Sequence, residues 1–330
     1  MLRASARVPE PFGQLRLLRD LTAFVRVNFL HVGVRLDLFT ALRRGPRSAE
    51  ELAAAAGVVD REALTMLLDL GVALGELRRA GPGRYRLTGR RAATLARRRA
   101  AAALVEETVA YHGTVYQGLP DLLRGGAKGD HLRTMAETVA ESSRILEPFT
   151  AAFVRDAVRG LRAPRVLDVG CGSGTYLATV ARAVPDASGV GLDVQPRAVD
   201  LSRRALAAAH AGDRFVVRQG NAMDDPQAGP FDVVLLLNNV YYFTDVERQK
   251  LFRSLRDSLG ERGRLLIASM FHGPTPTALN FSLVLWATKG CHPLPRLAHV
   301  VAELRDSGFS DVRATRLAPL EPYVGLVASR

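Results

Sequence analysis

Several features that would direct this 330-residue sequence toward other classes of protein are scarce or missing. Cysteine occurs only at Cys171 and Cys291, so neither a disulfide framework nor a cysteine-based metal cluster is available, and we expect no bound metal. The first residues, MLRASARVPEPFG, lack the apolar core of a signal peptide, and no stretch approaches the roughly 18 uninterrupted apolar residues of a membrane-spanning helix. These absences predict a cytoplasmic protein without a membrane partner.

Lysine is also scarce, since it occurs only at Lys128, Lys250 and Lys289. The formal net charge of +12 is therefore almost wholly an effect of arginine. Summed positive charge can attract nucleic acid or acidic lipid, but we interpret the densest basic cluster as the solvated face of a helix and expect no nucleic-acid partner. This cluster consists of Arg90, Arg91, Arg97, Arg98 and Arg99.

What the chain does contain is typical of a globular protein with two domains. Hydrophobic residues make up 48% and charged residues 24% of the sequence, close to the usual balance. The length of 330 residues exceeds the roughly 100 to 200 residues of an ordinary domain. We predict an N-terminal domain over residues 1–100, bridging helices over residues 101–158 and a C-terminal domain over residues 159–330.

The N-terminal domain begins with helical signals. Apolar positions at helical spacing predict two helices over residues 14–43, which a Gly-Pro pair ends. Ser48 and Glu51 then form a capping box, in which the hydroxyl and the carboxylate satisfy free backbone donors of the first helical turn. We expect this third helix to end at Ala56.

A second cap and a hairpin complete the pattern of a winged helix. Asp60 caps a helix that runs to about Leu74, and residues 76–79 and 84–88 form two strands around a Gly-Pro-Gly turn. The fold suggests DNA binding, but the sequence of the helix from Glu62 to Leu74 contains no lysine or arginine for phosphates or base edges. A DNA-binding regulator is therefore the weakest of our hypotheses, and the helix is built for burial.

The C-terminal domain shows the alternation of a doubly wound α/β sheet. Helical stretches over residues 92–123 and 132–158 precede it, and apolar runs of strand length then alternate with helical segments. The last two strands are joined by too short a turn for a crossover helix, so they must pair antiparallel. The seven predicted strands are Arg165–Val169, Gly189–Val194, Arg214–Arg218, Phe231–Leu237, Gly263–Ser269, Asp311–Leu317 and Tyr323–Ala328.

A glycine-rich loop after the first of these strands carries the strongest functional signal. Gly170, Gly172 and Gly174 alternate between an apolar strand and a helix that begins near Thr175, which lets the backbone approach a ligand closely. Thr175 replaces the last glycine of the dinucleotide pattern G-x-G-x-x-G. Asp168 beside the loop would repel a pyrophosphate but suits a cationic ligand.

The second predicted strand ends in another acid. Asp193 lies about 20 residues beyond the loop, where a carboxylate can accept hydrogen bonds from both ribose hydroxyls. Together, the glycine loop, the two acids and the terminal hairpin predict a site for a positively charged nucleoside.

This combination resembles the class I S-adenosylmethionine (SAM)-dependent methyltransferases, and the likeness covers essentially the whole chain. The N-terminal half is similar to the dimerisation domain of the small-molecule O-methyltransferases of secondary metabolism, through the segments Gly45-Pro46, Glu51-Leu52-Ala53 and Gly83-Arg84-Tyr85-Arg86-Leu87-Thr88. The resemblance implies a Rossmann-like seven-stranded methyltransferase sheet, a winged-helix dimerisation domain, a homodimer, and bridging helices that contribute to the acceptor pocket. It also implies SAM as cofactor and S-adenosylhomocysteine as product.

The same resemblance assigns roles to residues along the edge of the sheet. The cofactor would be bound by Asp168, Gly170, Gly172, Gly174, Asp193, Gln195, Asn221, Ala222 and Asn238. Of these, Asp193 holds the ribose, Gln195 and the Asn221-Ala222 segment lie near the adenine, and Asn238 faces the methionine end. The acceptor would be enclosed by His112, Met135, Tyr242 and Trp286.

One family feature is missing. Relatives that methylate hydroxyls carry a Leu-His-Asp-Trp-like segment after the fourth strand, whose histidine removes the acceptor proton, whereas this chain has Tyr241 at the histidine position. A positioned base contributes about 10²- to 10⁴-fold, and tyrosine with an ordinary pKa near 10 is a poor base at neutral pH. The candidate catalytic residues are therefore Tyr241 itself, His272 after the fifth strand and His292 in the following loop.

Three reactions fit these residues. We favour O-methylation of a small aromatic intermediate of secondary metabolism, such as antibiotic biosynthesis. C- or N-methylation is the second hypothesis, because an acceptor that needs no base could be methylated through proximity alone. The third is a SAM-binding enzyme of the methyltransferase fold that catalyses a cyclisation or rearrangement without methyl transfer.

Overall fold

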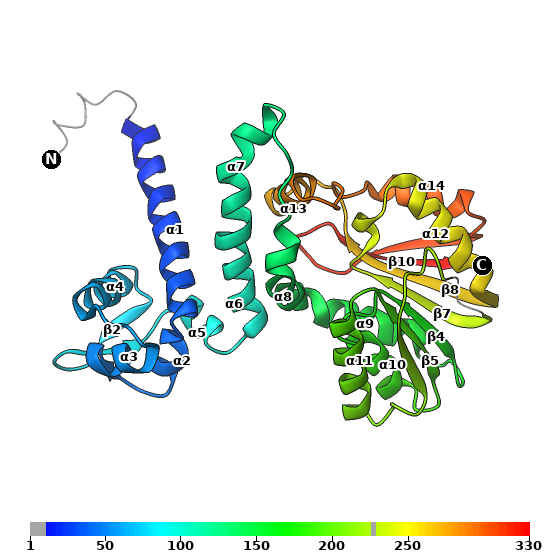
Figure 1. Ribbon diagram of the computed structural model, residues 1–330, viewed down its shortest axis with the longest axis horizontal. Helices are drawn as coiled ribbons and strands as arrows, with labels where there is room; N and C mark the ends of the chain where they lie inside the picture. Colours follow the sequence, from blue (N-terminus) through cyan, green and yellow to red (C-terminus); the bar gives the residue numbers. More distant parts are fainter. Residues whose placement is uncertain (1–10, 226–228) are drawn as a thin grey trace. The chain divides into compact units, whose positions relative to one another are not determined.

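The computed structural model describes residues 11–225 and 229–330 and divides the chain into two compact units (Figure 1). The first unit contains the described residues up to Pro120 together with Leu132–Ile145, and the second contains Asp121–His131 together with Leu146–Arg330. The predicted bridging segment, residues 101–158, is thus shared between the units. None of the helices in the described part of the chain combines the length and the apolar character needed to cross a membrane.

The first unit is mainly helical, with a small antiparallel sheet in the order β1-β3-β2. Its elements are α1 (Pro11–Arg35), α2 (Leu38–Arg43), β1 (Arg47–Ser48), α3 (Ala49–Ala56), α4 (Arg61–Ala73), β2 (Leu77–Arg79), β3 (Arg84–Leu87), α5 (Arg90–Leu95), α6 (Arg99–Glu106), the π-helix η2 (Glu107–His112), α7 (Gly113–Leu123) and α8 (His131–Ser143), which the unit boundaries cut at the ends of α7 and α8.

The predicted winged helix is confirmed by its caps. The Ser48 hydroxyl accepts the Glu51 N–H, the Glu51 carboxylate accepts the Ser48 N–H, and α3 ends at Gly57 in the left-handed region. The Asp60 carboxylate likewise accepts the Ala63 N–H at the start of α4. Apolar residues of these helices and of the wing form one core, which includes Phe29, Leu38, Phe39, Leu52, Leu68, Leu77 and Tyr85.

The helical stretch predicted over residues 92–123 is not continuous. It ends at Leu95, and Arg98 has an extended backbone before α6 begins. A run of three adjacent arginines there disfavours a continuous helix, because their like charges repel. The π-helix η2 then inserts extra residues into the helical path, a feature that apolar periodicity does not reveal.

The second unit contains a seven-stranded sheet in the order β6-β5-β4-β7-β8-β10-β9, with the terminal pair antiparallel as predicted. This is the methyltransferase form of the doubly wound sheet. Its elements are the 3-10 turn η3 (Arg144–Leu146, which begins in the first unit), α9 (Glu147–Val158), β4 (Arg165–Val169), α10 (Thr175–Ala183), β5 (Ser188–Asp193), α11 (Pro196–Ala208), β6 (Phe215–Gln219), β7 (Phe231–Leu237), the 3-10 turn η4 (Val240–Tyr242), α12 (Asp245–Ser258), β8 (Leu259–Met270), α13 (Pro276–Ala287), α14 (Leu297–Asp306), β9 (Asp311–Arg316) and β10 (Tyr323–Ser329).

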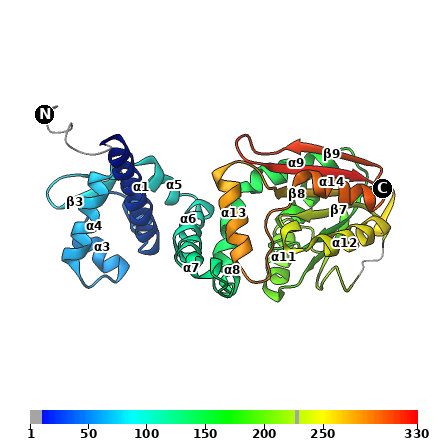
Figure 2. The same cartoon turned by 90° about the horizontal axis from the view of Figure 1, so that it is seen from above.

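Alternation along the strands separates the two faces of this sheet (Figure 2). One face packs against α12 and α14 in a core that includes Leu167, Val169, Val234, Leu236, Phe252, Leu255, Val300 and Leu304. The other face carries Asp168 and Tyr323, and it packs against α9 and α10 through contacts such as Thr150 with Tyr323. Both faces are covered, which explains why the strands read as continuous apolar runs.

The strand bounds agree with the sequence prediction to within one residue except in β8. This strand begins at Leu259 rather than at Gly263, and Leu259 pairs with Phe231 across an irregularity in register. The Gly-Glu-Arg-Gly sequence that follows Leu259 has the composition of a turn, which hid the first part of the strand.

Candidate functional site

The glycine loop is held against the neighbouring strand by its own backbone. The N–H groups of Gly170 and Cys171 both donate to the Leu192 carbonyl oxygen, at 2.8 and 2.9 Å. Gly170, Gly172 and Gly174 all have positive φ, and a Cβ at Gly172 would meet open space. The loop therefore exposes bare backbone at the carboxyl edge of the sheet, where ligands bind in open α/β folds.

Asp193 is fixed as an acceptor at the end of β5. One carboxylate oxygen accepts the Gly172 N–H at 2.9 Å and the other accepts the Gln195 N–H at 2.9 Å. Each oxygen has a second lone pair that these bonds leave available. The carboxylate is thus oriented by the backbone on both sides of the loop and can accept two further hydroxyl donors.

Asp168 lies one strand away and is almost fully enclosed, with 1% of its surface exposed. Its Oδ2 atom has no hydrogen-bond partner among the described residues. Burial, reinforced by the charge of Asp193, raises the pKa of Asp168 to about 8. An unpaired buried carboxyl group of this kind fits a ligand that brings a positive charge.

The segment after β6 adjoins this edge. The Gly220 N–H donates to the Asp193 carbonyl oxygen, and the Asn221 side chain accepts the Met223 N–H at 3.1 Å while donating to Asp224 at 2.7 Å. Ala222 packs against the core of the sheet. The structure therefore gathers the cofactor candidates of β4, β5 and β6, including Gln195 at the start of α11, along one edge.

Asn238 ends β7 with a left-handed backbone, φ 57°. Its Oδ1 accepts a hydrogen bond from the Tyr323 hydroxyl at 2.9 Å, and that hydroxyl also contacts Thr150 Oγ1 at 2.5 Å. Burial is the main cause that raises the pKa of Tyr323, so this phenol stays neutral and can donate. Tyr323 thereby fixes the orientation of the Asn238 amide.

The next residue, Asn239, is one that sequence reasoning missed. Its Nδ2 donates to the Val169 carbonyl oxygen at 2.7 Å, and a Cβ at Gly170 would lie 2.7 Å from that nitrogen. Its Oδ1 is buried without a hydrogen-bond partner in the described structure. Two adjacent asparagines gave no sequence signal as to which one contacts the glycine loop.

The three candidate bases lie on adjoining segments. The His292 N–H donates to the Tyr241 carbonyl oxygen at 3.3 Å, and the His272 N–H donates to the Pro295 carbonyl oxygen at 2.9 Å. The loop that carries His292 thus runs between the turn after β7 and the end of β8. The structure brings the backbones of these three candidates to the same edge of the sheet as Asn238.

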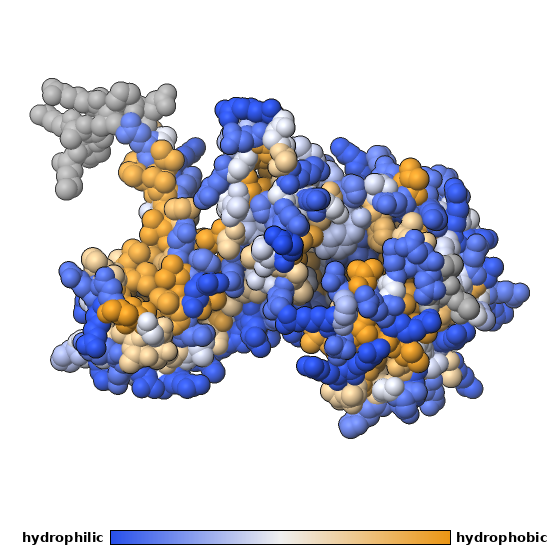
Figure 3. Space-filling model, viewed as in Figure 1, coloured by the Kyte–Doolittle hydropathy of each residue, from blue (hydrophilic) through white to orange (hydrophobic). Residues whose placement is uncertain are grey.

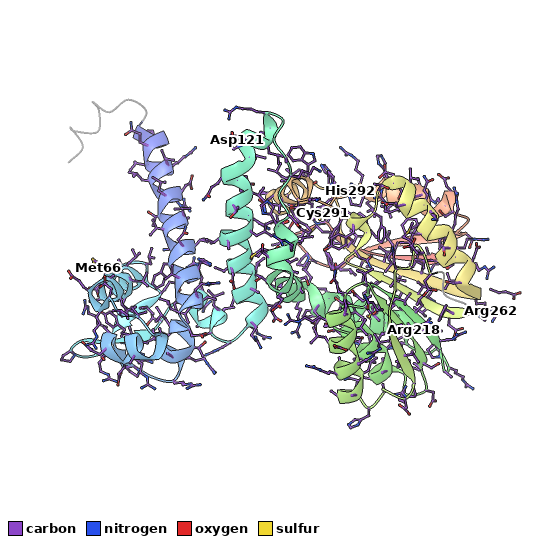
Figure 4. The ribbon with its side chains drawn as sticks, in the orientation of Figure 1. Met66, Asp121, Arg218, Arg262, Cys291 and His292 are labelled. Carbon is purple, nitrogen blue, oxygen red and sulfur yellow. The ribbon has the colours of Figure 1, made fainter. Side chains whose placement is uncertain are left out.

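Their side chains have different surroundings. The Tyr241 ring is 8% exposed and packs edge-on against Phe281 of α13, with ring centroids 5.5 Å apart. Tyr242 stacks at a tilt on Tyr241, at 4.9 Å, and remains more exposed. Figure 4 shows His292 beside Cys291 in the loop after α13, and its side chain lines a pocket with Thr244 and Arg248 at the start of α12.

The remaining acceptor candidates are divided between the units. Trp286 lies on α13 of the second unit, where the Lys128 ammonium is 5.6 Å from its ring centroid. Met135 lies on α8 and His112 on η2, both in the first unit. There, buried His112 is 3.4 Å from the Glu107 carboxylate. Across residues 11–225 and 229–330, no cluster of His, Cys, Asp and Glu has the make-up of a metal site.

Comparison with known protein families matches two parts of the chain. Residues 166–263 match the model of a methyltransferase domain, and residues 18–97 match the model of an O-methyltransferase dimerisation domain. The first range contains the glycine loop, both acids and the turn with Tyr241. The second contains most of α1 and the winged helix.

Similar proteins span nearly the whole chain. Demethylspheroidene O-methyltransferase of Cereibacter sphaeroides is 28% identical over 326 residues, covering 91% of this chain and 82% of that protein. 3-Hydroxy-5-methyl-1-naphthoate 3-O-methyltransferase of Streptomyces sahachiroi is 28% identical over 340 residues, covering 92% and 91%. The solved structure of an O-methyltransferase family protein from Burkholderia thailandensis superposes with a TM-score of 0.77 at 25% identity, covering 96% and 97%.

Proposed function

Because this chain belongs to the SAM-dependent O-methyltransferases that carry an N-terminal dimerisation domain, we propose that it methylates a hydroxyl oxygen of a small aromatic intermediate of secondary metabolism. The relatives named above act on a carotenoid precursor and on a hydroxynaphthoate, as their names state. A small apolar or aromatic alcohol is the substrate class that these two have in common. We also propose that the enzyme works in the cytoplasm, which suits its two free, buried cysteines.

The residues of the sheet edge fit SAM. The enclosed carboxyl of Asp168 has an oxygen without a partner, which suits a cationic ligand, and the carboxylate of Asp193 is oriented to accept two ribose hydroxyls. Gln195, Asn221 and Ala222 would lie on the adenine side, and the glycine loop would face the ribose and the methionine. When bound, SAM supplies an electrophilic methyl group on a sulfonium that departs as a neutral thioether.

The chain must also remove the acceptor proton as the new carbon–oxygen bond forms. We propose that this base is one of Tyr241, His272 and His292, whose backbones meet at the edge beside Asn238. Tyr242 and Trp286 would line the acceptor, together with His112 and Met135. The shared observation behind this assignment is the pair of backbone hydrogen bonds that bring the loop of His292 to both Tyr241 and the end of β8.

We further propose that the protein is a homodimer formed through the first unit. Large apolar side chains of α1 are exposed at helical spacing, among them Leu15, Leu17, Leu18, Leu21, Phe24 and Val25. Figure 3 shows apolar side chains gathered along this helix. Contiguous exposed apolar surface marks a protein interface, and the match to a dimerisation domain argues that a second copy of this chain covers it.

The test of this function is product analysis. Purified protein is incubated with SAM carrying a labelled methyl group and with a panel of phenols, naphthols and apolar alcohols, together with matched aromatic amines and carbon acids. We expect label in an ether product whose mass exceeds that of the acceptor by one methylene unit. Transfer only to carbon or nitrogen would replace O-methylation by the second hypothesis, and an isomer of unchanged mass would show a reaction without methyl transfer.

A further inference from the structure

Two buried oxygen atoms at the edge of the large sheet lack hydrogen-bond donors in the described structure: Asp168 Oδ2 and Asn239 Oδ1. Asp168 belongs to β4 and Asn239 follows β7 directly, and these two strands pair in parallel. A buried acceptor left unpaired destabilises a protein by about 1–3 kcal/mol, so natural structures rarely keep one without a ligand to satisfy it. Two such atoms on neighbouring strand ends indicate that a ligand supplies the donors.

The identity of the Asn239 acceptor atom follows from its surroundings. The Val169 carbonyl oxygen can only accept, so the amide atom 2.7 Å from it must be the nitrogen. The oxygen must then point the other way. The close approach of this amide to Gly170 requires glycine there, which places Asn239 against the loop that follows Asp168.

The chemistry of the pair selects the ligand group. An ammonium group has three donors and no acceptor, so it can satisfy an amide oxygen and a carboxylate oxygen at the same time. A sulfonium has no N–H or O–H donor. We propose that Asp168 and Asn239 together bind the α-ammonium group of the cofactor, and that Asn239 sets a preference for ligands that carry this group. The proposal deepens the cofactor site put forward above and rests on it.

A change of protonation should accompany binding. The charged group nearest in effect to Asp168 is Asp193, and the neutral thiol of Cys171 and phenol of Tyr176 also feel its charge. With a pKa raised to about 8, Asp168 carries a proton near neutral pH when no ligand is bound. An arriving ammonium stabilises the carboxylate, so this proton passes to solvent, and about one proton is released for each ligand bound.

The first test compares two ligands on one variant by calorimetry. The ligands are S-adenosylhomocysteine and its analogue in which hydrogen replaces the α-amino group. We expect Asn239→Ala to weaken S-adenosylhomocysteine about tenfold, the size of a hydrogen bond to a charged group, and to change the affinity of the analogue less than about twofold. Equal weakening of both ligands, or of neither, would overturn the role of Asn239.

Controls separate this role from general damage to the site. Asn221→Ala, on the adenine side, should weaken both ligands by the same factor. Asn239→Asp keeps an acceptor oxygen and should retain the preference for the amino-bearing ligand. If wild-type protein bound neither ligand, the proposed cofactor site would fail, whereas tight binding of both with no preference would contradict only the ammonium receptor.

The second test counts protons. Binding of S-adenosylhomocysteine is measured near neutral pH in two buffers with different ionisation enthalpies. We expect the wild-type protein to release about one proton, and Asp168→Asn to release none while still unfolding cooperatively. Release of the same number by Asp168→Asn, or no release by the wild-type protein, would contradict the paired receptor.

Discussion

The two units of this protein leave different kinds of group unsatisfied. The first unit leaves apolar side chains at the surface, since Leu15, Leu18 and Phe24 of α1 are 62%, 59% and 65% exposed. The second unit buries its apolar side chains but leaves two polar oxygens, of Asp168 and Asn239, without donors. Each departure costs free energy in the isolated chain. Exposed apolar area calls for another protein surface, whereas buried acceptors call for a small ligand with donors.

This difference teaches where to look for each function. Apolar contact has no direction and grows with area, so a long helix is well suited to joining two copies of a chain. Hydrogen bonding depends on the position of single atoms, so a fixed sheet edge is well suited to recognising one chemical group. Changes that supply or remove these groups should therefore affect only the property of the unit in which they are made.

The largest expected effect concerns the proton acceptor of the second unit. We expect one of the single variants Tyr241→Phe, His272→Gln and His292→Gln to lower kcat by about 10²-fold or more, because a positioned base contributes that much. Steady-state kinetics with an acceptor identified by product analysis measures this, and the affinity for S-adenosylhomocysteine should stay unchanged. Three variants with near wild-type kcat would remove all three residues from the role of base.

The next effect concerns ribose recognition. Asp193→Ala removes a carboxylate that can accept two hydroxyls, so the dissociation constant of S-adenosylhomocysteine should rise roughly a hundredfold. Asp232→Ala is the matched control, because Asp232 also accepts a backbone N–H, from Arg165, but lies at the start of β7. An affinity that falls equally in both variants would argue against a ribose clamp at Asp193.

The apolar surface of the first unit is tested by charge. We expect wild-type protein to have twice the 35.8 kDa mass of the chain in light scattering, and Leu21→Glu combined with Phe24→Glu to have the mass of one chain. Placing charges in an apolar interface adds desolvation to the loss of buried area. Val216→Glu, at an exposed apolar position on β6, should leave the dimer intact. A dimer that survives the α1 double variant would place the interface elsewhere.

The smallest effect is a pH dependence of stability. Folded Asp168 holds its proton up to about pH 8, whereas an unfolded aspartate loses it near pH 4. Between these values the folded state binds more protons, so the free energy of unfolding of the cofactor-free protein falls as pH rises. Urea unfolding at about pH 5 and about pH 8 should show a larger fall for wild-type protein than for Asp168→Asn. Equal falls would mean that Asp168 has an ordinary pKa.

Much of the fold follows from local signals in the sequence. Ser48, Glu51 and Asp60 cap their helices through bonds between residues only three apart, and β4 and β7 begin and end where their apolar runs do. The π-helix from Glu107 and the early start of β8 at Leu259 depend on packing and pairing with distant segments, so composition and period could not reveal them.

The site divides in the same way. The glycine loop and Asp193 could be assigned because their spacing is itself the signal. Asn239 could not, because its bond to the Val169 carbonyl joins residues 70 apart in the chain. Tyr323 was likewise identified only as the start of a strand, although its hydroxyl holds the side chain of Asn238.

The most direct test of the account is calorimetric titration of the wild-type protein with S-adenosylhomocysteine. The account predicts saturable binding of one molecule per chain at the edge formed by the glycine loop, Asp168 and Asp193. No measurable heat at millimolar ligand, confirmed by an unchanged unfolding temperature, would contradict it.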